Sequence, residues 1–254
     1  MTATVETAVE TAVKTAGKTT KASVIPLPPA DFLPNAIQVL LGYFVLRPWF
    51  SFFVRGRVLR SRDLPEGPCV LACNHRSFFD PPLVGMHRRR PVAYFARADL
   101  WQFPVIAFFL NTMFGIPIDR ENPGLSSMKG AVERLRRGIS VLVFPEGTRT
   151  RTGQVGPMRE GPAMFARRAG VPIVPVYVHR SEAIWARANK LPRFQSKGVE
   201  IRFGRPLVAP ANLDPRAQDA WVSRRLHLWM LAQERQFQRS TRPWPPAQRL
   251  PVVA

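Results

Sequence analysis

The sequence predicts an α/β fold: a single domain with a mostly parallel or mixed sheet flanked by helices, preceded by a membrane-associated helical hairpin. Two observations predict the α/β part. From about residue 68 onwards, short apolar segments of strand length alternate with segments in which apolar residues recur at helical spacing. Hydrophobic residues make up 46% of the 254 residues, which is enough for a sizeable core. At about 150 residues per domain, one large domain with additions at its ends accounts for this length.

The expected strands are short, apolar segments of the kind that lie buried in a sheet. They lie at residues 69–73, 91–95, 115–118, 140–144, 171–178 and 199–203. The strand at 140–144 is the most hydrophobic of the chain. Polar residues follow several of these strands directly, so the carboxyl ends of the strands are the first place to look for chemistry.

The expected helices are recognised by apolar spacing and by residues that begin or end helices. They lie at residues 101–113, 126–137, 162–169 and 215–238. Pro104 interrupts the first near its start, and Gly138 and Gly170 follow the ends of the next two. Asp214 and Pro215 form an N-cap and first-turn pair for the last and longest helix.

The chain divides into four segments, with a tail and linker at 1–30, membrane-associating helices at 31–60, the α/β domain at 61–240 and a proline-rich tail at 241–254. Residues 1–24 carry the weak repeat TAVE, TAVK, TAGK and no Trp, Phe or Leu, which is typical of a disordered or loosely helical tail. No compact apolar stretch follows a basic start, so a secretory signal is not expected.

Residues 36–54 are the most apolar segment, yet Arg47 and Pro48 lie in its middle. Proline removes a helical hydrogen bond, and a central arginine costs about 2.5–3.5 kcal/mol on membrane-insertion scales. We therefore expect two short helices that meet at Arg47-Pro48 and lie in the bilayer interface rather than cross it. Headgroup contacts are expected from Trp49, Arg55, Arg57 and Arg60. A buried core hairpin is the alternative.

The charge balance indicates an anionic partner. Lysine and arginine total 37 against 17 acidic residues, which gives a net charge of +20. Nucleic acid, a phospholipid surface and a phosphorylated substrate all fit this excess. The two cysteines, Cys69 and Cys73, lie on one predicted strand about 13 Å apart, too far for a disulfide, so we expect free thiols. No dense His/Cys cluster indicates a metal.

The segment Asn74-His75-Arg76-Ser77-Phe78-Phe79-Asp80 follows the strand at 69–73. Histidine is the usual general base near neutral pH. A carboxylate five residues on, after a turn, can reach the other ring nitrogen and hold the required tautomer. His75 and Asp80 are therefore candidate catalytic residues, although a structural loop histidine has the same spacing.

Two further polar segments follow strands. Arg120, at the end of Gly115-Ile-Pro-Ile-Asp119-Arg120, could bind a phosphate, or form a surface pair with Asp119. The second is Phe144-Pro-Glu-Gly-Thr-Arg-Thr-Arg-Thr-Gly153, which follows the most hydrophobic strand. Its candidate substrate-binding residues are Glu146, Gly147, Thr148 and Arg149. Glu146 would repel a phosphate, so it should pair with an arginine or accept from a substrate hydroxyl. A glycine-containing surface turn is the alternative.

Taken in order, these segments resemble the glycerolipid acyltransferase family, which includes the 1-acyl-glycerol-3-phosphate acyltransferases. The matching blocks are NHRSFFD at 74–80, with its HX4D spacing, GIPIDR at 115–120, FPEGTRTRTG at 144–153 and VPIVPV at 171–176. The resemblance covers about residues 60–210. It implies the fold of the glycerol-3-phosphate acyltransferases.

The resemblance also implies roles for individual residues. His75 matches the catalytic base and Asp80 the acid that orients it, while Pro172 belongs to the block associated with the acyl side. An acceptor-phosphate site is implied for Arg120, Glu146, Gly147, Thr148 and Arg149. One segment departs from the family, because Met158-Arg159-Glu160-Gly161 stands where an aromatic residue and a lysine usually precede a glycine.

We therefore expect an O-acyltransferase of phospholipid biosynthesis. It would transfer a fatty acyl group from acyl-CoA or acyl-carrier protein to a lysophospholipid, foremost 1-acyl-glycerol-3-phosphate, giving phosphatidic acid without a cofactor. Another lysolipid acceptor, such as a lyso-ornithine lipid, and a non-catalytic basic membrane-binding module are the alternatives. The expected location is the cytoplasmic face of the cell membrane, as a peripheral or monotopic protein in contact with phospholipids and not with nucleic acid.

Overall fold

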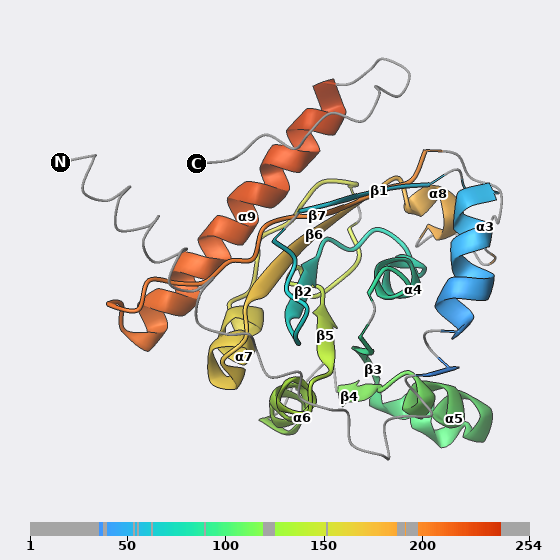
Figure 1. The fold of residues 1–254 in the computed structure, drawn as a ribbon, viewed down its shortest axis with the longest axis horizontal. Helices are drawn as coiled ribbons and strands as arrows, with labels where there is room; N and C mark the ends of the chain where they lie inside the picture. Colours follow the sequence, from blue (N-terminus) through green and yellow to red (C-terminus); the bar gives the residue numbers. More distant parts are fainter. Residues whose placement is uncertain are drawn as a thin grey trace.

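The fold is built on a seven-stranded sheet, seen in a computed structural model (Figure 1). The described residues are 36–37, 40–52, 54, 56–61, 63–88, 90–118, 125–150, 152–186, 191 and 198–239. The strands are β1 (Arg57–Arg60), β2 (Val70–Cys73), β3 (Val92–Arg97), β4 (Ile116–Ile118), β5 (Ser140–Val143), β6 (Ile173–His179) and β7 (Glu200–Phe203). Their order across the sheet is β1-β7-β6-β2-β5-β3-β4.

The sheet is mostly parallel. Strands β6, β2, β5, β3 and β4 run in the same direction, whereas β7 pairs antiparallel with β6 and parallel with β1. In the central register Leu71 of β2 lies between Leu142 of β5 and Val174 of β6. Because β2 and β5 are parallel neighbours, the segments that follow them start at the same edge of the sheet, and this brings the first and third motif blocks together.

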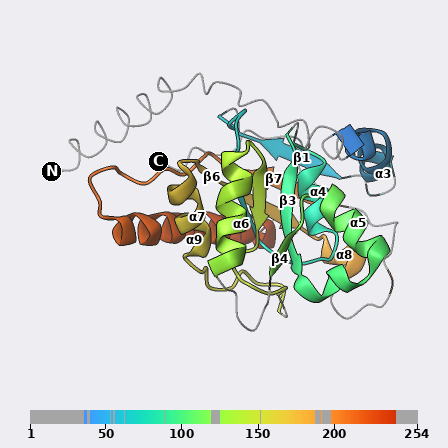
Figure 2. The same cartoon turned by 90° about the horizontal axis from the view of Figure 1, so that it is seen from below.

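Helices cover both faces of the sheet, as Figures 1 and 2 show. The helical elements are η1 (Leu41–Leu46), α3 (Arg47–Phe52), α4 (Asp80–Gly85), η2 (Ala98–Gln102), α5 (Pro104–Thr112), α6 (Leu125–Arg136), α7 (Gly161–Ala169), α8 (Glu182–Trp185) and α9 (Pro215–Arg239). Helices α6, α7 and α9 lie on one face, and α3 and α4 on the other. The predicted α/β class, a mixed and mostly parallel sheet flanked by helices, is therefore confirmed.

The alternating side chains of β2 fill two separate cores. Leu71 and Cys73 join the core beneath α3 and α4, and Val70 and Ala72 join the core beneath α6, α7 and α9. All four are fully buried, as a central strand covered on both faces requires. Both cysteines are free and buried, as expected.

The sequence-based elements are found within a few residues of their expected bounds, with three additions. Strand β1 and the short helices α4 and α8 were not predicted. Strand β1 falls inside the segment 31–60 assigned to membrane association, but it pairs along its whole length with β7 at the edge of the sheet. A four-residue edge strand with arginines at both ends carries too little apolar pattern to be recognised.

The segment expected to contain two short helices runs on as one helical stretch. The helical geometry changes at Arg47, from the π-helical η1 to the α-helical α3, and Arg47 itself keeps helical angles. The Arg47 N–H donates to the Gly42 carbonyl, five residues back. A π-helical turn next to Pro48 allows the helix to continue although the proline has no backbone N–H to donate. The expected hairpin as a whole, including Arg55, extends outside the described residues.

Part of this helical stretch packs on the domain. The Arg47 Nε donates to the Met86 carbonyl at 2.8 Å, and the Trp49 ring lies 5.5 Å from the Phe79 ring. Trp49 was expected at the headgroups, but Phe79 and the core take up part of its surface. Within the described ranges, no helix combines the length and hydropathy needed to cross a membrane.

Hydrogen bonds hold helix α9 at its N-terminus and at Asp219. The Asp214 Oδ1 accepts hydrogen bonds from the backbone N–H groups of Arg216 and Ala217, at 2.9 and 3.1 Å, which confirms the predicted N-cap. The Arg167 guanidinium of α7 donates to both carboxylate oxygens of Asp219, at 2.9 and 2.8 Å. This bidentate pair holds α7 and α9 together on the same face of the sheet.

Candidate active site

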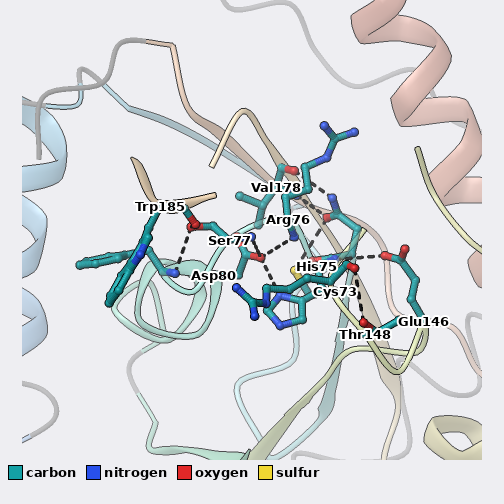
Figure 3. Close-up of polar contacts among 12 residues, drawn as sticks. Cys73, His75, Arg76, Ser77, Asp80, Glu146, Thr148, Val178 and Trp185 are labelled. Carbon is teal, nitrogen blue, oxygen red and sulfur yellow. Dashed lines mark hydrogen bonds and ion pairs between the residues drawn. The ribbon is translucent and has the colours of Figure 1, made fainter. Parts of the chain in front are cut away.

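The centre of the site is a hydrogen bond between the first and last residues of the HX4D motif. The Nδ1 atom of His75 lies 2.8 Å from the Oδ2 atom of Asp80 (Figure 3). An ionised carboxylate can only accept, so Nδ1 carries the proton and Nε2 holds the free electron pair. The Asp80 side chain is fully buried, and that of His75 is 16% exposed. The structure thus brings together the two residues that the sequence singled out as catalytic.

Backbone geometry holds Asp80 in place. Its Oδ2 also accepts the backbone N–H groups of Arg76 and Ser77, each at 2.7 Å, so the loop closes around the carboxylate. Asp80 is the first residue of α4, and Pro81 and Pro82 occupy the next positions, where a missing N–H costs nothing. The proline pair therefore starts the helix at the place where the carboxylate must turn back to His75.

Two polar side chains clamp this loop to neighbouring elements, and sequence reasoning did not single them out. The Asn74 amide donates to the Val178 carbonyl at 2.9 Å and accepts the Val178 N–H at 2.7 Å, and so continues the pairing of β2 with β6 by a side chain. The Ser77 Oγ donates to the Trp185 carbonyl at 3.0 Å, which ties the loop to α8. The burial of both polar residues could have been suspected only from their place in the motif.

Glu146 joins the first and third motif blocks. Its Oε1 accepts the His75 N–H at 3.0 Å (Figure 3). Its Oε2 accepts the Gly156 N–H at 3.1 Å. In return, the Thr150 N–H donates to the His75 carbonyl at 2.8 Å. Burial raises the pKa of the Glu146 carboxyl, while these N–H groups and His75 and Arg76 act against the rise. Both Glu146 carboxylate oxygens therefore accept from backbone N–H groups, partners that the sequence did not suggest.

Two guanidinium groups lie at the turn after Glu146: Arg149 belongs to the turn, and Arg159 reaches it from further along the chain. Gly147 has a φ of +75°, and the Arg159 guanidinium carbon lies 2.9 Å from the position that a Cβ atom would occupy. A residue with a side chain rarely adopts this positive φ, so glycine is favoured there. The Arg149 guanidinium carbon lies 3.4 Å from the centroid of the Phe78 ring. Thr148 is exposed, and its hydroxyl is directed to the Arg149 carbonyl at 3.4 Å.

Arg120, the remaining predicted phosphate ligand, lies outside the described residues. The strand that precedes it, β4, pairs with the carboxyl-terminal half of β3. That half of β3 is at the same edge of the sheet as the segments that follow β2 and β5.

Arg76 forms a partly buried charged cluster behind the loop that carries His75. Its guanidinium contacts the Tyr177 hydroxyl at 3.2 Å, the Glu182 carboxylate at 3.4 Å and the Glu234 carboxylate at 3.6 Å. Burial by itself lowers the pKa of Arg76, but Tyr177 and the two carboxylates together raise it. Glu234 also accepts the Val155 N–H at 3.0 Å. Helix α9 is thereby connected both to the loop that carries His75 and to the loop after the third motif block.

The His75 ring is also held from its flat side. Its centroid lies 3.7 Å from that of Phe144, and the two planes are inclined by only 16°. Phe144 is the residue directly after β5, so the same strand that presents Glu146 provides a stacking surface for the base. The imidazole is therefore fixed in its plane by Phe144 and in its rotation by Asp80.

Comparison with known proteins agrees with this geometry. A family model described as "Acyltransferase" matches residues 55–179. The 1-acyl-sn-glycerol-3-phosphate acyltransferase of Bacillus subtilis is 32% identical over 148 residues, which are 57% of this chain and 68% of the relative. The chain belongs to the 1-acyl-sn-glycerol-3-phosphate acyltransferase family. The sequence-based assignment to this family, and to the class of O-acyltransferases, is confirmed.

Other relatives agree. The Pseudomonas aeruginosa 1-acyl-sn-glycerol-3-phosphate acyltransferase is 29% identical over 71% of this chain and 76% of its own length. A chloroplastic acyltransferase of the same name from Brassica napus is 30% identical over 53% of this chain, but the match spans only 41% of that longer protein. The crystal structure of the 1-acyl-sn-glycerophosphate acyltransferase of Thermotoga maritima superposes with a TM-score of 0.64 at 19% identity, over 84% of this chain and 83% of that one. That likeness supports the fold.

Proposed function

We propose that this chain transfers a fatty acyl group from an acyl thioester, acyl-CoA or acyl-carrier protein, to the free hydroxyl of 1-acyl-glycerol-3-phosphate. The product would be phosphatidic acid. The observation that carries the proposal is the 2.8 Å hydrogen bond from His75 to the buried Asp80, at the sheet edge where the third motif block also begins. The names of the relatives support the choice of acceptor.

His75 acts as the general base in this proposal. Its Nε2 takes the proton of the acceptor hydroxyl as the oxygen attacks the thioester carbonyl carbon, and Asp80 stabilises the imidazolium that forms. When the tetrahedral intermediate collapses, the C–S bond breaks and the proton passes from His75 to the departing thiolate. No covalent acyl-enzyme is needed, because the acceptor oxygen itself is the nucleophile.

Arg149 is proposed to bind the acceptor phosphate, together with Arg120. Stacking on Phe78 holds the Arg149 guanidinium over a partly exposed ring, next to the loop that carries His75. The Arg159 side chain lies against Gly147, which belongs to the same turn as Arg149, and adds a second positive charge there. Glu146 supports the phosphate site indirectly, since its carboxylate joins the turn to the backbone of His75.

The second candidate is acylation of a different lysolipid, such as a lyso-ornithine lipid. It is favoured by Met158-Arg159-Glu160-Gly161, where Glu160 adds an exposed acidic side chain next to the turn. A non-catalytic membrane-binding module has no need of a hydrogen-bonded His–Asp pair, so we rank it below both enzymes.

Membrane association on the cytoplasmic face is proposed through the segment 31–60. Within its described part, large apolar side chains are left exposed on η1 and α3, including Phe44 at 74% and Phe52 at 79%. Exposed apolar side chains grouped on one surface mark a contact with a membrane or another protein. The net charge of +20 adds attraction to anionic headgroups.

The proposal is tested with purified protein in detergent, using labelled acyl-CoA or acyl-carrier protein and a panel of lysolipid acceptors. We expect 1-acyl-glycerol-3-phosphate to be the preferred acceptor and His75→Ala to abolish transfer. His227→Ala on α9 is the matched control and should retain activity. Preference for an acceptor without a phosphate monoester would favour the second candidate, and substantial turnover by His75→Ala would rule out the mechanism.

Arg149→Ala tests the assignment of the phosphate site. Loss of one charged contact costs about 1.5–3 kcal/mol, which corresponds to a rise of about 10- to 150-fold in the acceptor KM. The donor KM, measured in parallel, should stay within a small factor of its original value. A change confined to the donor KM would assign this arginine to the other substrate.

A further inference from the structure

Helix α5 leaves an apolar surface uncovered. The sequence from Leu100 to Ile118 contains no charged residue. Within it, Phe103 is 50% exposed, Val105 82% and Phe108 71%. Contiguous exposed apolar surface of this kind marks a contact with another protein or with a membrane.

This surface is a built part of the fold. The Trp101 indole N–H of η2 donates to the Asn111 side chain near the end of α5 at 2.9 Å, and the Gly115 N–H donates to the Leu110 carbonyl at 2.7 Å. A Cβ at Gly115 would lie 2.9 Å from that carbonyl oxygen, so glycine permits the tight return into β4. Among the described elements, α5 packs mainly on η2. The exposed apolar side chains of α5, such as Val105 and Phe108, are therefore held in position but do not pack into the core.

The topology places α5 at the edge of the sheet that carries the active site. Elements η2 and α5 follow the carboxyl end of β3, as His75 follows β2 and Glu146 follows β5. Strands β2, β5 and β3 are parallel neighbours, so these three ends lie side by side. A partner that contacts α5 is consequently presented to the edge where the His75 base lies.

A second exposed apolar surface lies at the same end of the molecule. Leu40, Phe44, Val45 and Phe52 of the η1–α3 region are all more than half exposed. Figures 1 and 2, seen from directions 90° apart, both place α3 and α5 at one end, away from α9. Two separate elements of the chain thus expose apolar side chains at that end.

We propose that α5 is a membrane-contacting element that inserts Val105 and Phe108 into the interface of an anionic bilayer, next to the η1–α3 contact. A lipid surface fits better than a second copy of this chain, because two copies that each carry a net charge of +20 repel one another. An anionic bilayer instead attracts that charge and accepts the apolar side chains. The proposal concerns binding alone and does not depend on the proposed acyl transfer.

The test is partition of the full chain onto vesicles of phosphatidylcholine and phosphatidylglycerol, measured by flotation. The double variant Val105→Ser, Phe108→Ser should lower the partition coefficient about tenfold or more, because polar side chains lose the apolar burial. The matched control is Leu228→Ser, with Leu228 51% exposed on α9 at a distance from this end, and it should bind unchanged. Both proteins should retain acyl transfer to an acceptor dispersed in detergent. His75→Ala should bind vesicles like the unmodified chain, so loss of catalysis and loss of binding are told apart.

A second measurement covers the case in which the double variant fails to fold. A polarity-sensitive dye on Val105→Cys should shift to the blue when vesicles are added, and the same dye on Leu228→Cys should not. The two natural cysteines are buried, so the dye reacts at the introduced thiol. Unchanged partition of the folded double variant, or no blue shift at position 105, would overturn the proposal. Loss of a dimer in sedimentation of the double variant would overturn it in favour of self-association.

Discussion

Asp80 serves both the histidine and the loop that carries it, because its Oδ2 accepts three hydrogen bonds. An asparagine in its place keeps the shape but brings an NH2 group that cannot accept. If the NH2 group takes the place of Oδ2, the imidazole loses the partner that keeps its proton on Nδ1; if the amide oxygen does, the partner stays but its negative charge is lost. The dependence of the site on Asp80 is therefore one of tautomer and orientation.

For Asp80→Asn we expect a kcat about a hundredfold lower, a smaller loss than that of His75→Ala, because the base stays present but is misoriented. The measurement is steady-state acyl transfer, with circular dichroism to show that the fold is retained. Phe79→Leu, next to Asp80 but outside its hydrogen bonds, is the control. An unaltered kcat in folded Asp80→Asn would contradict the assigned role.

Glu146 provides a pH-dependent test of the link between the motif blocks. Burial raises the pKa of its carboxyl above the ordinary value of 4.5. Between pH 4.5 and that raised pKa, the folded chain keeps this proton while the unfolded chain releases it. The free energy of unfolding contributed by this group is therefore present below pH 4.5 and lost as the pH rises through the raised pKa. Glu146→Gln should remove this part of the pH dependence, as measured by urea unfolding at several pH values. If the free energy of unfolding changes with pH in the same way for both proteins, burial of the Glu146 carboxylate does not affect the pH dependence of stability.

At the scale of elements, α9 connects the periphery of the domain to the loop that carries His75 and Asp80. Its Glu234 reaches both Arg76 and the backbone of Val155, although α9 lies outside the matched family segment. Both side chains of the ion pair are only 10% exposed. Removing Glu234 takes away the buried one of the two carboxylates that balance the Arg76 charge and leaves only the partly exposed Glu182.

Glu234→Ala should therefore destabilise the fold by about 3 kcal/mol, and Glu234→Gln by less, because glutamine still accepts the Val155 N–H. Arg235→Ala on the exposed side of α9 is the matched control and should change stability by at most about 0.5 kcal/mol. Chemical denaturation measures all three. If Glu234→Ala unfolds at the same denaturant concentration as the control, the buried pair contributes no net stability.

At the scale of the whole molecule, apolar contact should dominate the interaction with membranes. High salt screens the attraction between the +20 chain and anionic lipid but leaves apolar burial intact. We expect salt washing to leave the protein on membranes and detergent to release it. Release by salt alone would show that charge dominates.

The structure also decides how this membrane contact should be disrupted. Deleting residues 1–24 should leave binding unchanged, but a deletion through residue 60 would remove β1 from the sheet and confound the result. Phe44→Ser with Phe52→Ser removes exposed apolar surface and keeps β1. We expect this pair to weaken flotation, and a protease-accessible tag at residue 1 to stay on the side of the catalytic domain. A tag on the opposite side would show that the chain crosses the bilayer.

Much of the fold was accessible from the sequence, because local pattern determines whether a segment forms a strand or a helix. The apolar run at 140–144 and the N-cap at Asp214 depend only on neighbouring residues, and both predictions are confirmed. Strand β1 was not predicted from the sequence, because this edge strand is stabilised by its pairing with β7 rather than by its own composition.

The contact between His75 and Asp80 could also be predicted, since the two residues are close in sequence and the turn between them is short. The hydrogen-bond partners of Glu146, by contrast, were decided only by the tertiary structure. Its partners, the N–H groups of His75 and Gly156, come from different loops that meet because β2 and β5 are neighbours in the sheet. Local sequence determined most of the strands and helices of this protein and the residues of its motifs. Strand order decided which polar groups satisfy one another, because hydrogen-bond partners distant along the chain are chosen by the packing that brings them within reach.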